Sequence, residues 1–295
     1  MGINYHTLKS WPFPPIEQTY TERDTIIYAL GVGCGQDPLD TDALNLVYEP
    51  ALVAMPSMAA VLGFPGNWMK DPLSGIDYVK VVHGEQSVRI HQLLPNSGTV
   101  IGYSRVKSLI DKGSGKGALV LIERLIYEKE TSALLATVEQ LNFCRGDGGF
   151  SENDQPSDPA PSPGPAMPTM PPDHVCDIST RPESAALYRL CGDYNPLHMD
   201  PAVARAAGFE RPILHGLATY GIATHAVLKT LCNYQTTKVS RVSARFSSHV
   251  FPGETIRTEF WRGQRDADGK EEVRFRARVL GRDKVVLDNG RAYIR

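Results

Sequence analysis

A short polar segment in the second half of the chain carries three side chains that could act together as acids and bases. The segment reads Gly192-Asp193-Tyr194-Asn195-Pro196-Leu197-His198, so a carboxylate, a carboxamide and an imidazole lie close together. Gly192 favours a helix end and Pro196 disfavours helical backbone at Asn195, which predicts an irregular loop. A carboxylate beside an imidazole suits acid–base chemistry on water. The alternative is that Asp193 and Asn195 only cap turns.

A second feature lies directly before an apolar helix pattern, at His215-Gly216. The backbone N–H of Gly216 would be one of the unpaired donors at a helix N-terminus, where negative charge is stabilised. A carbonyl oxygen that gains charge during a reaction could bind there, as in an oxyanion hole. The alternative is that the glycine only makes room for packing.

The elements that position these groups are predicted from apolar patterns. Residues 216–231 are apolar almost all round, which predicts a buried helix. Strand patterns surround a glycine-rich turn at residues 99–110 and 118–129, and four more follow at residues 239–250, 255–263, 271–280 and 284–294. A curved antiparallel sheet wrapped around a buried helix is an α+β architecture.

The two halves of the chain share this pattern. Thr21 and Thr180 each precede an acidic residue by three places, which predicts helix N-caps. Apolar runs follow both, and then a Pro-Leu pair at residues 38–39 and again at 196–197. The first-half counterpart of the buried helix is the region 51–62, which Pro56 interrupts. The pattern therefore predicts two domains of one fold.

A polar, proline-rich segment separates the two halves. Residues 151–172 contain eight prolines and read as a partly extended linker. The expected organisation is an N-terminal domain of residues 1–150, the linker, and a C-terminal domain of residues 173–295.

Composition excludes several classes of function. The 31 Lys and Arg residues and 33 Asp and Glu residues give a net charge of −2, which argues against a nucleic-acid binder or a polybasic membrane anchor. The longest apolar stretch is too short to span a bilayer. Five cysteines without a Cys-x-x-Cys pair fit neither a disulfide framework nor a zinc site. We expect reduced thiols, no bound metal and a cytoplasmic location, or a peroxisomal one in a eukaryote, although no Ser-Lys-Leu type signal ends the chain.

The catalytic segment carries a family resemblance. Residues 188–198, Tyr-Arg-Leu-Cys-Gly-Asp-Tyr-Asn-Pro-Leu-His, followed by Pro-Ile-Leu-His-Gly at 212–216, resemble the signature of the MaoC-like (R)-specific 2-enoyl-CoA hydratases, the 2-enoyl-CoA hydratase 2 family. In the first half, residues 83–86, 111–115 and 145–150 are similar to the N-terminal domain of the hydratase unit of peroxisomal multifunctional enzyme type 2. The resemblance covers the chain apart from the linker and implies a double hot-dog fold.

The resemblance also implies roles for individual residues. Asp193 and His198 would activate the water that adds to C3 of a trans-2-enoyl-CoA, Asn195 would orient that water, and the Gly216 N–H would bind the thioester oxygen. The implied contacts to the acyl-CoA are made by His83, Gly84, Lys112 and Phe246. The implied product is a (3R)-3-hydroxyacyl-CoA, as in β-oxidation. No cofactor is implied, since CoA is part of the substrate, and a homodimer is expected.

The first half lacks the acid–base pair, because Asp37-Pro-Leu-Asp40 takes the place of Asn195-Pro-Leu-His198. Its expected role is to shelter the acyl chain and help to hold CoA. Three other functions remain open: a MaoC-type dehydratase for a branched, dicarboxylic or carrier-protein-bound acyl group, a hot-dog thioesterase, and a non-catalytic acyl-CoA binding protein.

Overall fold

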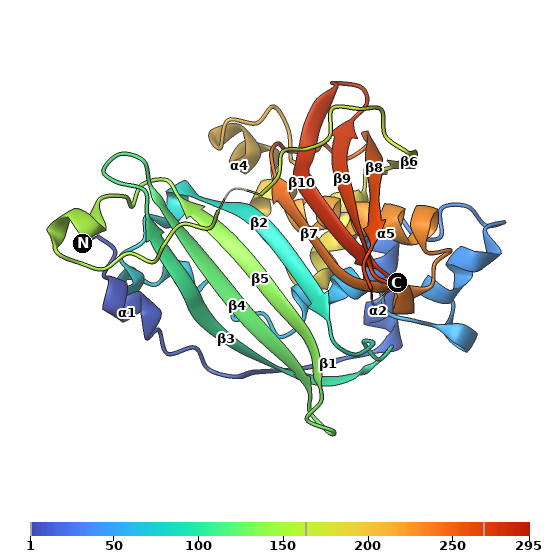
Figure 1. The fold of residues 1–295 in the computed structure, drawn as a ribbon, viewed down its shortest axis with the longest axis horizontal. Helices are drawn as coiled ribbons and strands as arrows, with labels where there is room; N and C mark the ends of the chain where they lie inside the picture. The colour runs from blue at the N-terminus through green and yellow to red at the C-terminus, as the bar shows by residue number, and fades with distance from the viewer. Residues whose placement is uncertain (1, 163, 268) are drawn as a thin grey trace.

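The computed structural model describes residues 2–162, 164–267 and 269–295, in which the strands form one antiparallel sheet (Figure 1). The sheet has ten strands in the order β1-β3-β4-β5-β2-β7-β10-β9-β8-β6. The strands of the first half are β1 (Ile16–Tyr20), β2 (Val81–Ile90), β3 (Gly98–Asp111), β4 (Ala118–Glu128) and β5 (Leu134–Cys144). Those of the second half are β6 (His174–Ser179), β7 (Val239–Phe246), β8 (Thr255–Arg265), β9 (Glu271–Val279) and β10 (Lys284–Ile294).

The strand order repeats the same arrangement twice, and the two copies meet at β2 and β7. Each copy has its first strand at an outer edge and its second strand at the join. Val88 of β2 lies opposite Val242 of β7, so the join is a regular strand pair. The expected α+β class and the six predicted strands are confirmed, whereas the strand signals of β1, β2, β5 and β6 were missed by the sequence patterns.

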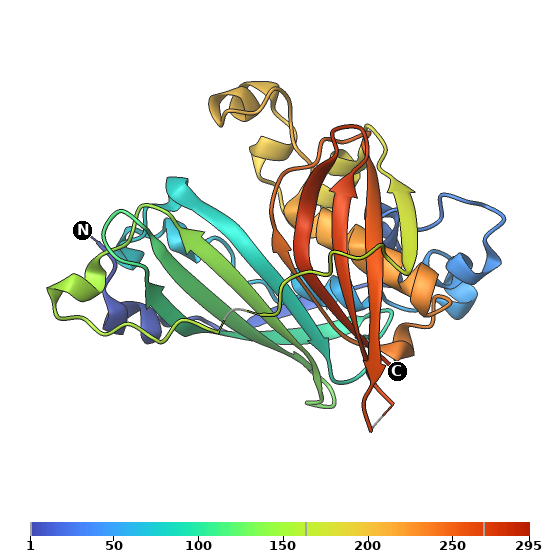
Figure 2. The ribbon, with the colours of Figure 1, turned by 45° about the horizontal axis from the view of Figure 1, so that its top comes forward.

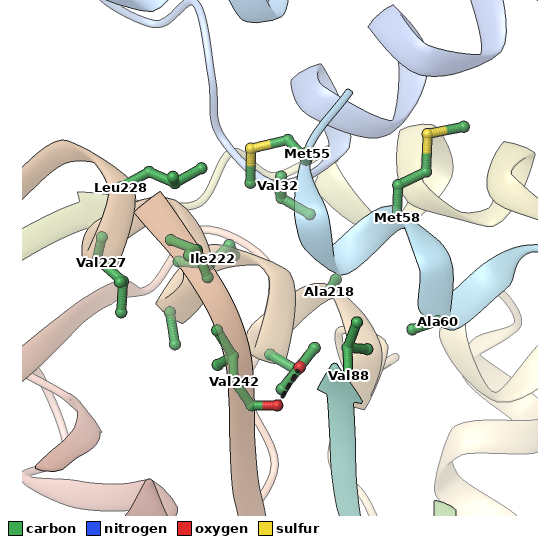
Figure 3. Packing of buried hydrophobic residues seen from close by; sticks show 14 of the residues in the cluster. Val32, Met55, Met58, Ala60, Val88, Ala218, Ile222, Val227, Leu228 and Val242 are labelled. Atoms are coloured by element: carbon green, nitrogen blue, oxygen red, sulfur yellow. Dashed lines mark hydrogen bonds between the residues drawn. The ribbon is translucent and has the colours of Figure 1, made fainter. Parts of the chain in front are cut away.

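The central helix α5 spans Gly216–Leu231, the bounds that its apolar pattern predicts. It packs against β6, β7, β8 and β10 of its own half and against β2 and the 3₁₀ helix η3 (Pro56–Val61) of the first half. Figure 3 shows Met55 and Met58 on the η3 side and Ile222, Val227 and Leu228 on the α5 side of this shared core. In the first half, the place of the central helix is therefore taken by six residues of 3₁₀ helix.

The remaining helices are short. The α-helices are α1 (Tyr5–Lys9), α2 (Glu22–Gly31), α3 (Ser184–Tyr188) and α4 (Pro201–Ala206). The other 3₁₀ helices are η1 (Thr41–Leu46), η2 (Glu49–Ala51), η4 (Trp68–Lys70), η5 (Pro72–Ser74), η6 (Tyr78–Lys80), η7 (Phe150–Asn153), η8 (Arg189–Cys191), η9 (Pro196–His198) and η10 (Thr236–Lys238).

The two predicted helix N-caps have different outcomes. Thr21 is the N-cap of α2, and its backbone N–H donates to Asp24 Oδ2 at 2.8 Å, as the sequence predicts. The prediction for Thr180 is wrong, because α3 begins later, with Glu183 at its N-cap. The Thr180 hydroxyl instead donates to the carbonyl oxygen of Glu254 at 2.8 Å and accepts from the Gly253 N–H. This threonine therefore ties the start of the helical segment to the turn before β8.

The proline-rich segment crosses the outer face of the sheet from one half to the other (Figures 1 and 2). Beyond η7 its described residues have irregular backbone, and Pro163 lies outside the described residues. Asp158 accepts from the Leu109 N–H at 2.8 Å, and Trp261 donates to the carbonyl oxygen of Met170 at 2.9 Å. Within the described chain, no helix has the length and hydropathy needed to cross a membrane.

Candidate active site

The loop at residues 193–198 is held by hydrogen bonds from its own side chains. Gly192 ends the preceding helical segment with φ 115°, a conformation that suits glycine. Asp193 Oδ1 accepts from the Asn195 N–H and Asn195 Oδ1 accepts from the Leu197 N–H, both at 3.1 Å. The turn-capping interpretation therefore describes part of what these side chains do. The other carboxylate oxygen of Asp193, Oδ2, faces His198.

His198 presents an unprotonated nitrogen to Asp193. Its Nδ1 donates to the carbonyl oxygen of Ile213 at 2.8 Å, so in the neutral ring Nε2 carries the lone pair. Nε2 lies 3.9 Å from Asp193 Oδ2. Burial lowers the pKa of His198, which keeps the imidazole neutral near pH 7. Two proton acceptors at this separation suit a water molecule that donates one hydrogen bond to each, at about 2.8 Å.

His215 is a site residue to which the sequence patterns assign no role. Its ring stacks on that of His198 with centroids 3.7 Å apart and 29° between the planes. Its Nε2 donates to the backbone carbonyl oxygen of Asp193 at 3.1 Å. Burial and the neighbouring His198 lower the pKa of His215 to about 4. His215 therefore holds both members of the acid–base pair, and only its place directly before Gly216 could have pointed to it.

Gly216 is the first residue of α5, at the end of the helix nearest this pair. An N–H at this position has no acceptor inside the helix, and the helix dipole makes it a favourable place for an anionic oxygen. A Cβ atom on Gly216 would lie 3.4 Å from Cε1 of Phe246. The glycine thus leaves the N–H open beside an aromatic ring.

Two of the predicted substrate contacts meet at the join between the halves. The rings of His83 on β2 and Phe246 on β7 lie 4.6 Å apart, centroid to centroid. Gly84 lies at a register shift in β2, where a Cβ would approach the carbonyl oxygen of Leu141 to 3.2 Å. Burial, followed by the charge of Asp193, raises the pKa of Tyr78, which places this phenol within electrostatic reach of the catalytic loop. Tyr78 was not found by the sequence patterns.

Lys112 lies further from this group, in the turn between β3 and β4. Its ammonium is 4.6 Å from the centre of the Phe143 ring. Phe143 is opposite Val82, the residue before His83. The structure therefore brings Lys112 to the same end of the sheet as His83.

The counterpart of the catalytic loop in the first half is occupied by structural contacts. Asp40, at the position equivalent to His198, accepts a hydrogen bond from the Tyr234 hydroxyl at 2.8 Å. Its Oδ2 also lies 3.7 Å from the ammonium of Lys229 on α5. Asp40 in addition caps η1. This position therefore ties the two halves together.

Asp193, His198 and His215 are of the residue types that bind metals, and within the described chain their ligand atoms lie within 4.8 Å of one another. The geometry suits a metal poorly. The lone pair of an imidazole lies in its ring plane, so two stacked rings do not direct their lone pairs at one ion. His215 Nε2 and His198 Nδ1 already donate to carbonyl oxygens. The arrangement suits proton transfer instead.

Buried histidines should make the stability of the fold depend on pH. Burial lowers the pKa values of His215 and His225 to about 4, whereas an unfolded histidine has a pKa of about 6.5. Between these values the unfolded chain binds more protons than the folded one. The free energy of unfolding should therefore hold above pH 6.5 and fall towards pH 4, by about 1.4 kcal/mol per pH unit for each histidine.

Urea unfolding between pH 7.5 and 4.5 measures this dependence. His225→Gln should reduce the slope by the contribution of one histidine, since glutamine does not titrate. A free energy of unfolding that stays level from pH 7.5 to 5 would contradict the prediction.

Comparisons with known proteins show which family models and relatives the chain matches. Residues 18–146 match the family model described as the MFE-2 hydratase 2 N-terminal domain, and residues 165–283 match the MaoC like domain. The chain is 39% identical to enoyl-CoA hydratase 2, peroxisomal, from Arabidopsis thaliana, over 97% of this chain and 94% of that one. It is 35% identical to 3-hydroxyacyl-thioester dehydratase Y from Mycobacterium tuberculosis, over 94% and 93% of the two chains.

Solved structures confirm the fold. A MaoC-like dehydratase from Phytophthora capsici superimposes with a TM-score of 0.84 at 32% identity, covering 99% of both chains. A Mycobacterium tuberculosis protein with a double hotdog fold superimposes with a TM-score of 0.57 at 15% identity, covering 96% of this chain and 94% of that one. The expected double hot-dog fold is therefore confirmed.

Proposed function

Because this chain belongs to the MaoC-like enoyl-CoA hydratase 2 family, we propose that it hydrates trans-2-enoyl-CoA reversibly to (3R)-3-hydroxyacyl-CoA. The observation that carries the proposal is the pair of proton acceptors, Asp193 Oδ2 and His198 Nε2, which face each other at 3.9 Å. This spacing is too long for a direct hydrogen bond and suits one bridging water.

The proposed reaction adds this water across the double bond. The water oxygen forms a bond to C3 while one member of the pair takes its proton. The electrons of the double bond move towards the thioester, and the Gly216 N–H stabilises the resulting enolate oxygen. A proton then passes from the pair to C2, so the pair returns to its starting state. Asn195 contributes by holding the loop in shape.

Substrate is held where the two halves meet. Phe246 lies beside Gly216 and contacts His83, which Gly84 follows on β2. We propose that these three residues contact the acyl-CoA and that Lys112, at the same end of the sheet, provides a cation for the phosphates of CoA. We propose that no redox cofactor takes part, since the addition of water changes no oxidation state overall. We also propose that no metal takes part, since the stacked rings of His198 and His215 do not direct their lone pairs at one ion. Activity should therefore survive dialysis against EDTA.

A hydration assay tests the proposal directly. Purified protein incubated with crotonyl-CoA and with longer enoyl-CoAs should remove the enoyl-thioester absorbance and yield the (3R) product in chiral analysis. A lack of hydration at every chain length would rule the function out. Binding without turnover would identify an acyl-CoA binding protein, and release of free CoA would identify a thioesterase.

A dehydratase for carrier-protein-bound acyl groups is the second candidate. The relative named as a 3-hydroxyacyl-thioester dehydratase favours it, because that name specifies no CoA. Comparing kcat/KM for one acyl group on CoA and on a carrier protein separates the two functions.

The finer details of assembly and compartment follow from the same proposal. A homodimer is proposed from the family, and light scattering of the purified chain measures it. The five cysteines are unpaired, four of them buried, which suits a reducing compartment such as the cytosol.

A further inference from the structure

Four aromatic rings form a column that runs from the first half of the chain to the catalytic loop. Tyr28 of α2 lies against Tyr188 of α3 with ring centroids 6.0 Å apart, and Tyr188 lies 5.1 Å from His215. His215 in turn stacks on His198 at 3.7 Å. These four residues, here called the ring column, connect a helix of the first half with the catalytic imidazole by direct contacts.

The ring column is buried, yet several polar atoms along it have no hydrogen-bond partner. Tyr28, Tyr188 and His215 are each 1% exposed. Four buried atoms lack a partner among the described residues: the hydroxyls of Ser57, Tyr28 and Tyr188, and Nδ1 of His215. Buried hydroxyls and ring nitrogens normally have partners, because burying them unpaired is costly. Four such atoms along one column indicate a feature that packing alone does not explain.

The three hydroxyls gather around Tyr28. Burial raises the pKa of Tyr28, and the hydroxyls of Ser57 on η3 and of Tyr188 offset part of that rise, so the three lie close together. Two glycines make room for the rings. A Cβ on Gly221 of α5 would lie 3.1 Å from the Tyr28 hydroxyl, and one on Gly31 of α2 would lie 3.3 Å from the Tyr188 ring. The Tyr28 hydroxyl is thus enclosed where the two halves meet.

The unpaired nitrogen of His215 bears on the shape of the catalytic loop. His215 Nε2 donates to the carbonyl oxygen of Asp193, and because the ring is neutral near pH 7, Nδ1 carries the lone pair. If the proton moved to Nδ1, a lone pair on Nε2 would face the carbonyl oxygen and the bond to Asp193 would be lost. A donor to Nδ1 therefore stabilises the tautomer that holds the loop. The hydroxyls of Tyr188 and Tyr28 are the unused donors of the ring column.

Tyr220 of α5 shows how a buried tyrosine is accommodated elsewhere in the same core. Its side chain is fully buried, and its hydroxyl donates to the backbone carbonyl oxygen of Val242 at 2.9 Å. Phenylalanine in place of Tyr28 or Tyr188 would fill the same space without burying an unpaired hydroxyl. Stability alone therefore gives no reason for these two hydroxyls, whereas a contribution to catalysis does.

We propose that Tyr28 and Tyr188 are positioning residues for the acid–base pair. Their hydroxyls pass hydrogen bonds along the ring column, directly or through bound water, to Nδ1 of His215. These bonds keep His215 in the tautomer that holds Asp193 beside His198. The inference rests on the proposed hydratase function and gives the first half, through Tyr28, a part in orienting the catalytic groups.

Tyr28→Phe and Tyr188→Phe test the proposal, because each removes one hydroxyl and leaves the ring in place. Each variant should lower kcat with crotonyl-CoA by about three- to tenfold, the effect of losing one neutral hydrogen bond. KM should stay unchanged, since neither residue belongs to the proposed substrate contacts. The melting temperature should stay level or rise, since an unpaired buried hydroxyl is removed. The double variant should match Tyr188→Phe, because the two hydroxyls act in series.

Tyr220→Phe is the matched control, because it removes a buried hydroxyl that has a partner and lies outside the ring column. The bond to the Val242 carbonyl oxygen is lost, so the melting temperature should fall while kcat stays unchanged. Tyr28→Phe and Tyr220→Phe should therefore show opposite patterns, the first a loss of kcat and the second a loss of stability.

NMR spectra of protein with labelled histidine side chains supply a second measurement. In the wild type, His215 should show the tautomer with its proton on Nε2. Tyr188→Phe should shift the signals of His215 towards a mixture of the two tautomers, a change that looser packing alone does not produce. Comparison with His215→Gln assigns the signals.

Several results would overturn the proposal while leaving the hydratase function intact. One is a wild-type kcat in both phenylalanine variants, and another is an effect of Tyr188→Phe without an effect of Tyr28→Phe. A loss of kcat accompanied by a fall in melting temperature as large as that of Tyr220→Phe would also overturn it, as would an unchanged His215 tautomer in Tyr188→Phe. If the wild-type protein hydrates no enoyl-CoA, the proposed function fails instead.

Discussion

Replacing Asp193 with asparagine should reduce the rate of hydration by about a thousandfold, because the amide can no longer accept a proton from water. The side chain is half exposed, and its turn-capping bond to the Asn195 N–H can be kept by the amide oxygen. The fold should therefore survive, and kcat should fall far more than KM rises. Steady-state kinetics with crotonyl-CoA, together with circular dichroism, measure both effects.

His198→Gln should cause a loss of similar size, since glutamine has no basic nitrogen. The double variant should lose little more than either single variant, because both residues act on one water. Asp200→Asn is the matched control: it changes a nearby carboxylate that caps α4 through the Ala202 N–H and takes no part in the proposed reaction. If Asp193→Asn and His198→Gln each kept more than a tenth of the wild-type kcat, the proposed chemistry would be wrong.

Gly216→Pro should lower kcat by about a hundred- to a thousandfold by removing a single hydrogen-bond donor. Proline is well tolerated at the first position of a helix, where the N–H has no partner within the helix. His215 has ψ 135°, which is compatible with a following proline. The substitution therefore removes the proposed oxyanion donor while α5 remains intact.

Gly216→Ala is the matched variant for this experiment. It adds the same Cβ beside Phe246 but keeps the N–H. The difference in kcat between the proline and alanine variants then reports the donor, and their melting temperatures report the packing. Equal kcat values in the two variants would show that the Gly216 N–H does not stabilise the transition state.

Elements with strong local signals could be predicted from the sequence. The apolar pattern of residues 216–231 gave the bounds of α5, and the glycine-rich turn gave the β3–β4 pair. The helix N-cap predicted at Thr180 was wrong because the side chain of Thr180 forms hydrogen bonds with Gly253 and Glu254, which are distant in sequence. The spacing of neighbouring residues does not reveal a partner that lies far away in the sequence, so the start of α3 could not be predicted correctly.

The candidate site was predictable to a similar extent. Asp193 and His198 lie in one loop, and their proximity follows from sequence spacing. His215 lies far along the chain, and its stacking on His198 depends on how α5 docks behind the loop. The contact between His83 and Phe246 needs the β2–β7 pairing, which only the folded sheet provides.

The bonds of Asp40 to Tyr234 and Lys229 have a consequence for stoichiometry. When two copies of a fold share one chain, a substitution alters one copy only, whereas in a pair of identical single-copy subunits it would alter both. The first copy thus carries a structural contact, Asp40, at the position where the second copy carries the imidazole of His198. Each chain should bind a single acyl-CoA, and a calorimetric titration should saturate at one ligand per chain.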